Sequence, residues 1–247
     1  MAAGDRGRRR GVSPRYAAIV RYQAVVFDFF GTLTVASAPE RRVAAITAVA
    51  EAIGAPPEEF RRVWWETWSD RCVGAMGDFS TALADVAGRL GVPATAEQLA
   101  AAAELRRSGE RSFRNLRRDA VSTLRTLREW DVDIALISDC TDELPDEWDT
   151  LEVAPYIRVP VFSYTARLKK PDPRIFALAC EGLGVEPAGC LFVGDGGSDE
   201  LAGATAAGMT AVRILDEGTV HHRFEPVNWT GPEIKSLSEV LDLVSRP

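Results

Sequence analysis

Short apolar segments recur along this chain, and most of them end in a small or acidic residue. Four have the length and the Val, Ile, Leu and Phe content of buried strands. They are residues 24–28, 132–138, 190–195 and 211–215. Helical patterns lie between them, over residues 120–130, 173–182 and 200–207, with Asp119 as the expected N-cap of the first. Alternating strands and helices are typical of a parallel sheet covered on both faces, so the sequence predicts an α/β protein with a Rossmann-like sheet.

A different pattern occupies residues 36–115. This stretch is rich in Ala, Arg and Trp, lacks strand-like segments and is divided by Gly and Pro. The expected helices cover residues 40–53, 57–70, 79–90 and 95–115. We interpret the stretch as an α-helical domain inserted after the first strand, which assigns residues 21–35 and 116–247 to the α/β core. No low-complexity linker separates the two parts, so the insert is expected to dock on the core.

The composition narrows the class of partner and the compartment. The chain carries a net charge of −7, although residues 1–20 are basic and are predicted to form a flexible tail. No apolar run approaches the roughly 18 residues that a membrane span needs, and the acidic body argues against nucleic acid as a partner. The four cysteines form no Cys-x-x-Cys pair, so a reducing cytoplasm is the expected compartment. The oligomeric state is left open.

Polar residues that can carry chemistry stand at the ends of three predicted strands. They are Asp28, Ser138 and Asp195. Open α/β sheets bind ligands beyond the carboxyl ends of their strands, so these side chains are expected to lie close together. Lys170, in a Pro-rich loop before a helix, can add a fixed ammonium group. A carboxylate nucleophile, a hydroxyl, an ammonium and an acidic metal-binding cluster are what phosphoryl transfer through an aspartyl intermediate needs.

Together these segments resemble the four ordered signatures of the haloacid dehalogenase superfamily, over roughly residues 22–34 and 117–215. The hexapeptide Asp28-Phe29-Phe30-Gly31-Thr32-Leu33 resembles the first signature, whose Asp is the nucleophile. The resemblance implies that Thr32 is the hydroxyl beside the nucleophile, that Ser138 is the second-signature serine and that Lys170 is the third-signature lysine. It also implies that the helical insert is a cap that closes over the site.

The resemblance further implies a Mg²⁺ site. Its ligands would be Asp28, the backbone carbonyl of Phe30, Asp195 and a second acid of the fourth signature. Counting back from the helix that follows favours Glu200 as that acid, whereas a shorter family spacing selects Asp199. We expect Glu200 to bind the metal and Asp199 to cap the helix.

Phe30 stands where most phosphatases of the superfamily have a second acid, which protonates the leaving oxygen and activates water. Loss of a positioned general acid or base typically lowers the rate by about 10²–10⁴-fold. A leaving group that needs no proton, such as a halide or an activated phosphate, escapes this loss. The 2-haloacid dehalogenases of the superfamily resemble the chain in having an aromatic residue here, whereas the acidic fourth signature resembles that of metal-binding members.

Three functions therefore stay open. The first is Mg²⁺-assisted hydrolysis of a phosphate-type substrate, the second is metal-independent dehalogenation of a 2-haloacid, and the third is ligand binding with weak or no catalysis. In each case a small, anionic organic molecule is the expected partner.

Two secondary features have both structural and functional interpretations. Trp64 and Trp68 are expected to share one face of a helix. They either pack inside the insert or form an aromatic wall over a substrate. A row of arginines at helical spacing forms either a solvated face, a surface that attracts an anionic substrate, or a nucleic-acid surface. They are Arg107, Arg111, Arg114 and Arg118.

Overall fold

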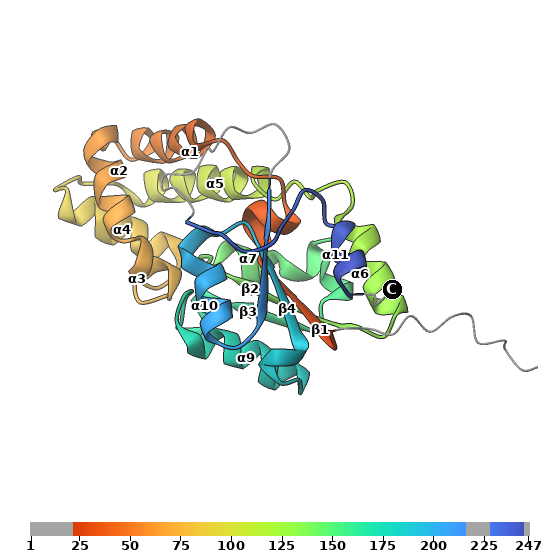
Figure 1. The fold of residues 1–247 in the computed structure, drawn as a ribbon. Coiled ribbons are helices and arrows are strands. Elements are labelled where there is room, and N and C mark those ends of the chain that lie inside the picture. The colour runs from red at the N-terminus through yellow and green to blue at the C-terminus, as the bar shows by residue number, and fades with distance from the viewer. Residues whose placement is uncertain (1–21, 216–227, 245–247) are drawn as a thin grey trace, which may run out of the picture.

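The structure is a computed structural model that describes residues 22–215 and 228–244, so the predicted tail of residues 1–20 lies outside the described residues. Within these ranges, six parallel strands form one sheet in the order β3-β2-β1-β4-β5-β6 (Figure 1). The strands are β1 Ala24–Phe27, β2 Asp133–Ser138, β3 Val159–Phe162, β4 Cys190–Gly194, β5 Thr210–Ile214 and β6 Glu233–Ile234. The order reverses direction at β1, so the carboxyl ends of β2 and β4 flank the end of β1. The predicted fold class, an α/β protein with a Rossmann-like parallel sheet and an inserted helical domain, is confirmed.

Helices cover both faces of the sheet because its strands are apolar on both sides. Val25 and Phe27 pack in one core cluster, against α6 (Ala120–Glu129) and α11 (Glu239–Val244). Ala24 and Val26 pack in another, against α9 (Pro173–Leu183) and α10 (Glu200–Ala206). This alternation follows the two-residue period of a strand. The helices of this part are α6 Ala120–Glu129, α7 Glu143–Glu147, α8 Ser163–Ala166, α9 Pro173–Leu183, α10 Glu200–Ala206 and α11 Glu239–Val244.

The helical insert lies between β1 and β2 in the chain and forms a separate group of helices in space (Figure 1). It consists of α1 Pro39–Ala52, α2 Pro57–Glu66, α3 Trp68–Cys72, α4 Phe79–Arg89 and α5 Ala96–Ser112. Of these helices, α1, α2, α4 and α5 share a hydrophobic core of their own. Trp64 is buried in that core, with its ring stacked on Phe60 at 5.6 Å between centroids. Trp64 therefore packs the insert, as one of the two interpretations predicts. No helix in the described ranges is long and apolar enough to cross a membrane.

The chain enters and leaves the insert through two adjacent segments. The backbone N–H of Val35 donates to the carbonyl of Asn115 at 2.8 Å, and that of Arg117 donates to Leu33 at 2.9 Å. An antiparallel bridge joins Thr34 and Leu116 between them. The entering segment begins a few residues after Asp28, and the leaving segment is hydrogen-bonded to it.

Three local expectations need correction. The sequence pattern does not predict β3, because Pro160 interrupts a four-residue apolar run, or the two-residue β6. The helix expected over 57–70 is divided into α2 and α3 at Thr67. Asp119 precedes α6 but makes no capping hydrogen bond with its side chain. Its Oδ2 instead accepts a hydrogen bond from the backbone N–H of Ser238, 2.9 Å away, and so ties α6 to the segment before α11.

Candidate active site

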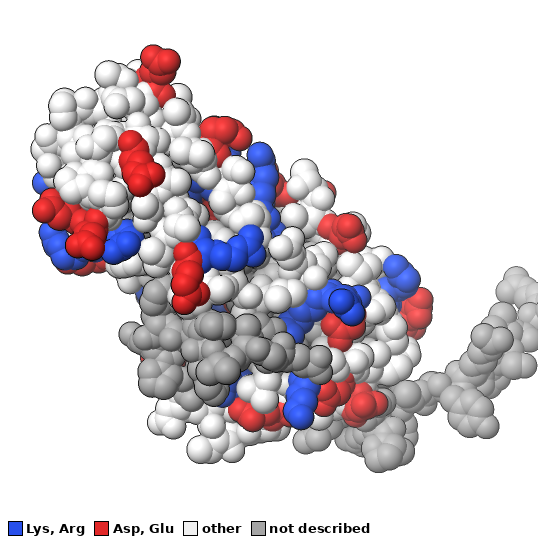
Figure 2. Space-filling model, turned by 90° about the horizontal axis from the view of Figure 1, so that it is seen from above, with Lys and Arg blue, Asp and Glu red and all other residues white. Residues whose placement is uncertain are grey.

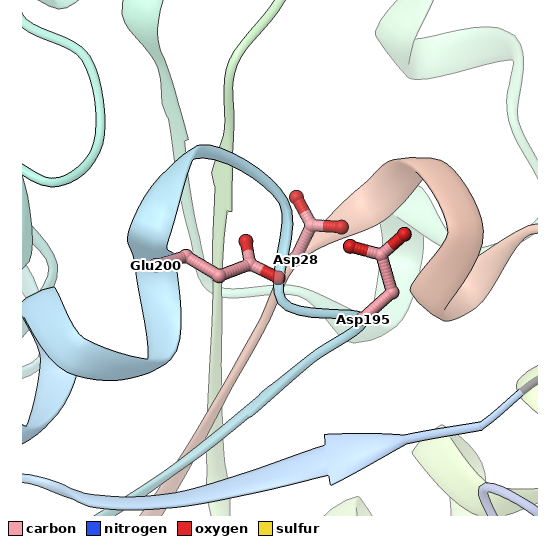
Figure 3. A group of neighbouring side chains, drawn as sticks. All are labelled: Asp28, Asp195 and Glu200. Carbon is pink, nitrogen blue, oxygen red and sulfur yellow. The ribbon is translucent and has the colours of Figure 1, made fainter. Parts of the chain in front are cut away.

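Three carboxylates meet at the carboxyl end of the sheet. Asp28 follows β1, Asp195 follows β4 and Glu200 begins α10, and their side chains point toward one another (Figure 3). One oxygen of each carboxylate lies within 4.8 Å of the others. Asp28 and Glu200 are buried, and Asp195 is half-buried. The reversal of strand order at β1 brings the three together.

The turn after β1 fixes the orientation of Asp28. The backbone N–H of Asp28 continues the sheet by donating to Val193 of β4 at 2.9 Å. The chain then turns sharply through Gly31, which has φ 84° and donates its N–H to Thr34 Oγ1 at 3.0 Å. A Cβ at position 31 would collide with the carboxylate of Asp195. Glycine is thus required here by both the backbone conformation and the close approach of Asp195.

Lys170 joins two of the carboxylates. Its ammonium lies 2.5 Å from Oδ1 of Asp28 and 2.5 Å from Oε2 of Glu200, and it donates to the carbonyl of Ile137 at 3.3 Å. The loop that carries it is anchored by a 3.0 Å hydrogen bond from the Lys170 N–H to Oδ1 of Asp139. The Lys170 side chain is 3% exposed, so this ion pair lies away from bulk water.

Burial and charge perturb these groups together. Burial raises the pKa of Asp28, and the negative charge of Asp195 raises it further, against the opposing effect of Lys170. Burial and Asp28 likewise raise the pKa of Glu200 well above its ordinary value. Burial alone would lower the pKa of Lys170, but Asp28 and Glu200 attract its proton and raise the pKa well above the ordinary value. Lys170 is therefore charged, and the carboxylates would be stabilised by a further cation.

Two buried hydroxyls near these carboxylates have no hydrogen-bond partner. Thr32 and Ser138 are fully buried, and within the described residues neither Oγ1 of Thr32 nor Oγ of Ser138 finds a donor or acceptor. Thr32 follows Asp28 by four residues, and Ser138 is the last residue of β2, which neighbours β1. Unsatisfied buried hydroxyls are uncommon, so both are available to oxygens of a ligand.

The residues present fit a hard divalent cation. Mg²⁺ prefers oxygen ligands and is typically held by one or two carboxylates together with oxygens of substrate or water. Asp28, Asp195 and Glu200 supply such oxygens, although both oxygens of Glu200 already accept hydrogen bonds, from Lys170 at 2.5 Å and from the Gly196 N–H at 2.8 Å. Each carboxylate oxygen has two lone pairs, so these bonds leave a coordinating position.

Asp199 lies outside this group. It is exposed, its backbone is left-handed at φ 50°, and its side chain makes no capping hydrogen bond to α10. The expectation that Asp199 caps the helix is therefore wrong. Glu200 faces the carboxylates instead, because it is the first residue of α10 and the turn before it directs its side chain inward (Figure 3).

The predicted arginine row does not form a free basic surface. Arg107 pairs with Glu104, and Arg111 and Arg114 both pair with Glu147 of α7. On the face shown in Figure 2, basic and acidic side chains lie interspersed over the insert and the core. The sequence pattern missed the partner Glu147 because it is 33 residues or more from these arginines in the chain.

One cation near the site is not among the residues that the sequence predicts there. Arg42 of α1 places its guanidinium 5.8 Å from the centroid of the Phe30 ring. In sequence it is one of two adjacent arginines near the start of a predicted helix, and its helical position does not indicate the contact. Only the docking of the insert brings it to Phe30.

Comparisons with known proteins agree with this architecture. A model of the haloacid dehalogenase-like hydrolases matches residues 22–208. (S)-2-haloacid dehalogenase 4A of Burkholderia cepacia is 33% identical over 132 residues, which cover 52% of this chain and 54% of that protein. A probable phosphoglycolate phosphatase of Pseudomonas putida is 37% identical over 93 residues, 37% of each chain. The chain thus spans about half the length of the first relative and less of the second. A solved dehalogenase in an intermediate complex is 26% identical, with a TM-score of 0.61 over 93% of this chain and 100% of that one.

Proposed function

The chain belongs to the haloacid dehalogenase-like hydrolases, and from this premise we propose that it hydrolyses a small phosphate-type substrate with the help of Mg²⁺, through a covalent intermediate on Asp28. The gathering of Asp28, Asp195 and Glu200 within 4.8 Å is the observation that carries the proposal. With all three carboxylates ionised, the single ammonium of Lys170 would leave two negative charges in a largely buried place. A divalent cation held by the three acids would balance them.

Each residue has a distinct task in this reaction. Asp28 forms a bond from its carboxylate oxygen to phosphorus as the bond to the leaving oxygen breaks, and water then displaces Asp28 from phosphorus. Lys170 favours the ionised form of Asp28 against the effect of burial, and it orients Asp28 through the 2.5 Å contact to Oδ1. The unpartnered hydroxyls of Ser138 and Thr32 donate to the transferring oxygens. Bound Mg²⁺ would neutralise charge on the phosphoryl group.

Phe30 restricts the leaving group. Its side chain cannot supply a proton, so the proposed substrate is one whose leaving oxygen departs as a stable anion, such as an acyl or enol phosphate. Every residue has a backbone carbonyl, so the carbonyl of Phe30 remains a proposed metal ligand although its side chain cannot bind one.

The helical insert is the proposed cap, with boundaries at residues 36 and 115, and it would select the substrate. The insert contacts the core through ion pairs: Arg106 of α5 pairs with Glu143 at 2.7 Å, and Arg114, which follows α5, pairs with Glu147 at 2.7 Å. We place the reaction in the cytoplasm, since all four cysteines are buried free thiols.

Dehalogenation of a 2-haloacid is a second candidate, and one observation favours it. A halide leaving group needs no proton, so the lack of an acid at Phe30 does not hinder its departure. The relative that is 33% identical is named as a haloacid dehalogenase. In that reaction Asp28 would displace halide from carbon, and no metal would be needed.

A screen of acyl phosphates, phosphate monoesters and 2-haloacids, each with chelator and with added Mg²⁺, separates the candidates. Phosphate release that chelator removes and Mg²⁺ restores supports the proposed function. Halide release that chelator leaves unchanged supports dehalogenation and overturns the proposal. Ligand binding without turnover on the whole panel would identify an inactive binding protein.

A further inference from the structure

Arg42 is a half-buried cation that forms no ion pair with the residues that the structure describes. Its guanidinium lies 4.9 Å from the ring centroid of Phe113 and 5.8 Å from that of Phe30. Within residues 22–215 and 228–244, no side-chain hydrogen bond or ion pair of Arg42 is formed. Burial lowers its pKa, as does the nearby Arg106, against the attraction of Glu110 and Asp195. A cation removed from water without a partner is unfavourable, so this position favours a bound anion.

The same guanidinium lies beside a residue of the proposed active site. Phe30, which it overlies, follows the nucleophile Asp28 by two residues. Asp195, a member of the carboxylate group, is among the charges that act on Arg42. An anionic group bound to Arg42 would therefore belong to a molecule that also reaches the end of β1.

The other buried arginines of the insert already have partners. Arg106 pairs with Glu110 and Glu143, each at 2.7 Å. Arg71 stacks on the ring of Trp64 at 3.6 Å and donates to the carbonyl of the same residue at 2.6 Å, which fixes it to its own segment. Their guanidinium groups are therefore committed to the structure, whereas that of Arg42 is available to a ligand.

The side chain at position 30 decides this availability. An acid there would lie beneath Arg42 and neutralise it. The ring face of Phe30 attracts the guanidinium of Arg42 but accepts no hydrogen bond from its N–H groups and does not neutralise its charge. Phe30 thus accounts both for the lack of an acid at this position and for the lack of a carboxylate beneath Arg42.

We propose that Arg42 binds a carboxylate that the substrate carries in addition to the phosphate placed at Asp28. This inference rests on the proposed function and narrows it to small phosphorylated carboxylic acids. A single guanidinium supplies one positive charge and a fork of parallel N–H donors, which match the charge and shape of a carboxylate. Arg42 would in this way determine specificity from the insert while the core carries out the reaction.

Binding of two phosphonates tests the inference. Phosphonoacetate and methylphosphonate share a phosphonate and differ in one carboxylate, and calorimetry with saturating Mg²⁺ gives both affinities. The native protein is expected to bind phosphonoacetate about 10- to 100-fold more tightly, the range of a charge-assisted hydrogen-bonded pair. Arg42→Gln should remove this preference. Arg41→Gln is the matched control, since it removes the same charge from the exposed neighbour on α1, and it should retain the preference.

Two results would overturn the inference: equal affinity of the native protein for both ligands, or a preference that survives in Arg42→Gln. Arg42→Lys keeps the charge without the fork and should retain part of the preference, so it provides the test if the Gln variant does not fold. The measurement needs no turnover. A protein that hydrolyses phosphates but lacks an Arg42-dependent preference refutes the carboxylate site alone, and one that shows the preference but no turnover refutes the proposed hydrolysis alone.

Discussion

The ammonium of Lys170 lies 2.5 Å from Oδ1 of Asp28, in a place where both side chains are less than a tenth exposed. The same ammonium contacts Glu200, so one cation separates two buried carboxylates. Loss of this cation would leave two buried carboxylates without a positive charge to offset their repulsion and burial. The stability of the site and its chemistry therefore depend on the same contact.

Lys170→Met should abolish turnover and lower the free energy of unfolding by about 3–5 kcal/mol at pH 7. Without Lys170, the main group that opposes the effect of burial on the pKa of Asp28 and Glu200 is lost. Both acids then take up protons more readily in the folded state than in the unfolded state, so the deficit should shrink as the pH falls toward 5. Denaturant unfolding at the two pH values checks this, and an equal deficit at both would contradict the assigned ion pair.

Ser138→Ala should reduce turnover without reducing stability. The hydroxyl of Ser138 has no partner to lose among the described residues, whereas its proposed bond to the transferring oxygen is made only in the reaction. We expect turnover to fall about 10²-fold and the melting temperature to stay constant or rise. Thr123→Val is the control, because Thr123 of α6 is also buried and unpartnered but belongs to no proposed catalytic group. Equal activity of the two variants would argue against the assigned role of Ser138.

Asp142→Asn should stabilise the protein at pH 7. Burial and the adjacent Glu143 raise the pKa of Asp142 from its ordinary value of 3.8 to about 6. A raised carboxyl pKa means that ionisation destabilises the fold, an effect absent below pH 3.8 and complete above pH 6. Asparagine removes the charge and keeps an acceptor for the Phe79 N–H. We expect a gain of about 1 kcal/mol at pH 7, reduced from the full shift because the side chain is partly solvated, and none at pH 3.5. A variant less stable than the native protein at pH 7 would refute this.

Phe30→Asp should add a general acid to the site and weaken the preference of Arg42 for a carboxylate. The new acid can protonate a leaving oxygen, so hydrolysis of alkyl phosphates, which leave poorly, should rise by about 10²-fold. The same acid would pair with Arg42, so the preference for phosphonoacetate over methylphosphonate should fall. Rates on an alkyl phosphate and the two affinities measure both effects. A gain in rate with an unchanged preference for phosphonoacetate would show that Arg42 does not bind the carboxylate of the ligand.

The sequence predicts those parts of the site that follow from strand ends. Asp28, Ser138 and Asp195 each end an apolar run, and parallel strands place such ends together. The choice of Glu200 over Asp199 followed from counting along a helix, and the structure brings Glu200 to the other acids. These inferences need only local periodicity and a fold class.

Contacts between distant segments are beyond the reach of the same reasoning. The sequence places Lys170 in the site but does not show that it lies between Asp28 and Glu200, since that depends on how its loop packs. The contact between Arg42 and Phe30 depends on the docking of the insert. Asp119 looked like a helix cap, but a tertiary hydrogen bond to Ser238 engages its side chain instead.

The covalent role of Asp28 is the central claim, and mass spectrometry of the quenched enzyme tests it most directly. Tryptic cleavage after Arg21 and Arg41 gives a peptide in which Asp28 is the single aspartate. After acid quenching during Mg²⁺-supported turnover of an acyl phosphate, this peptide should carry the added mass of one phosphoryl group, and Asp28→Asn should show neither the adduct nor turnover. Turnover at the native rate in Asp28→Asn, or an adduct on a different peptide, would contradict the account.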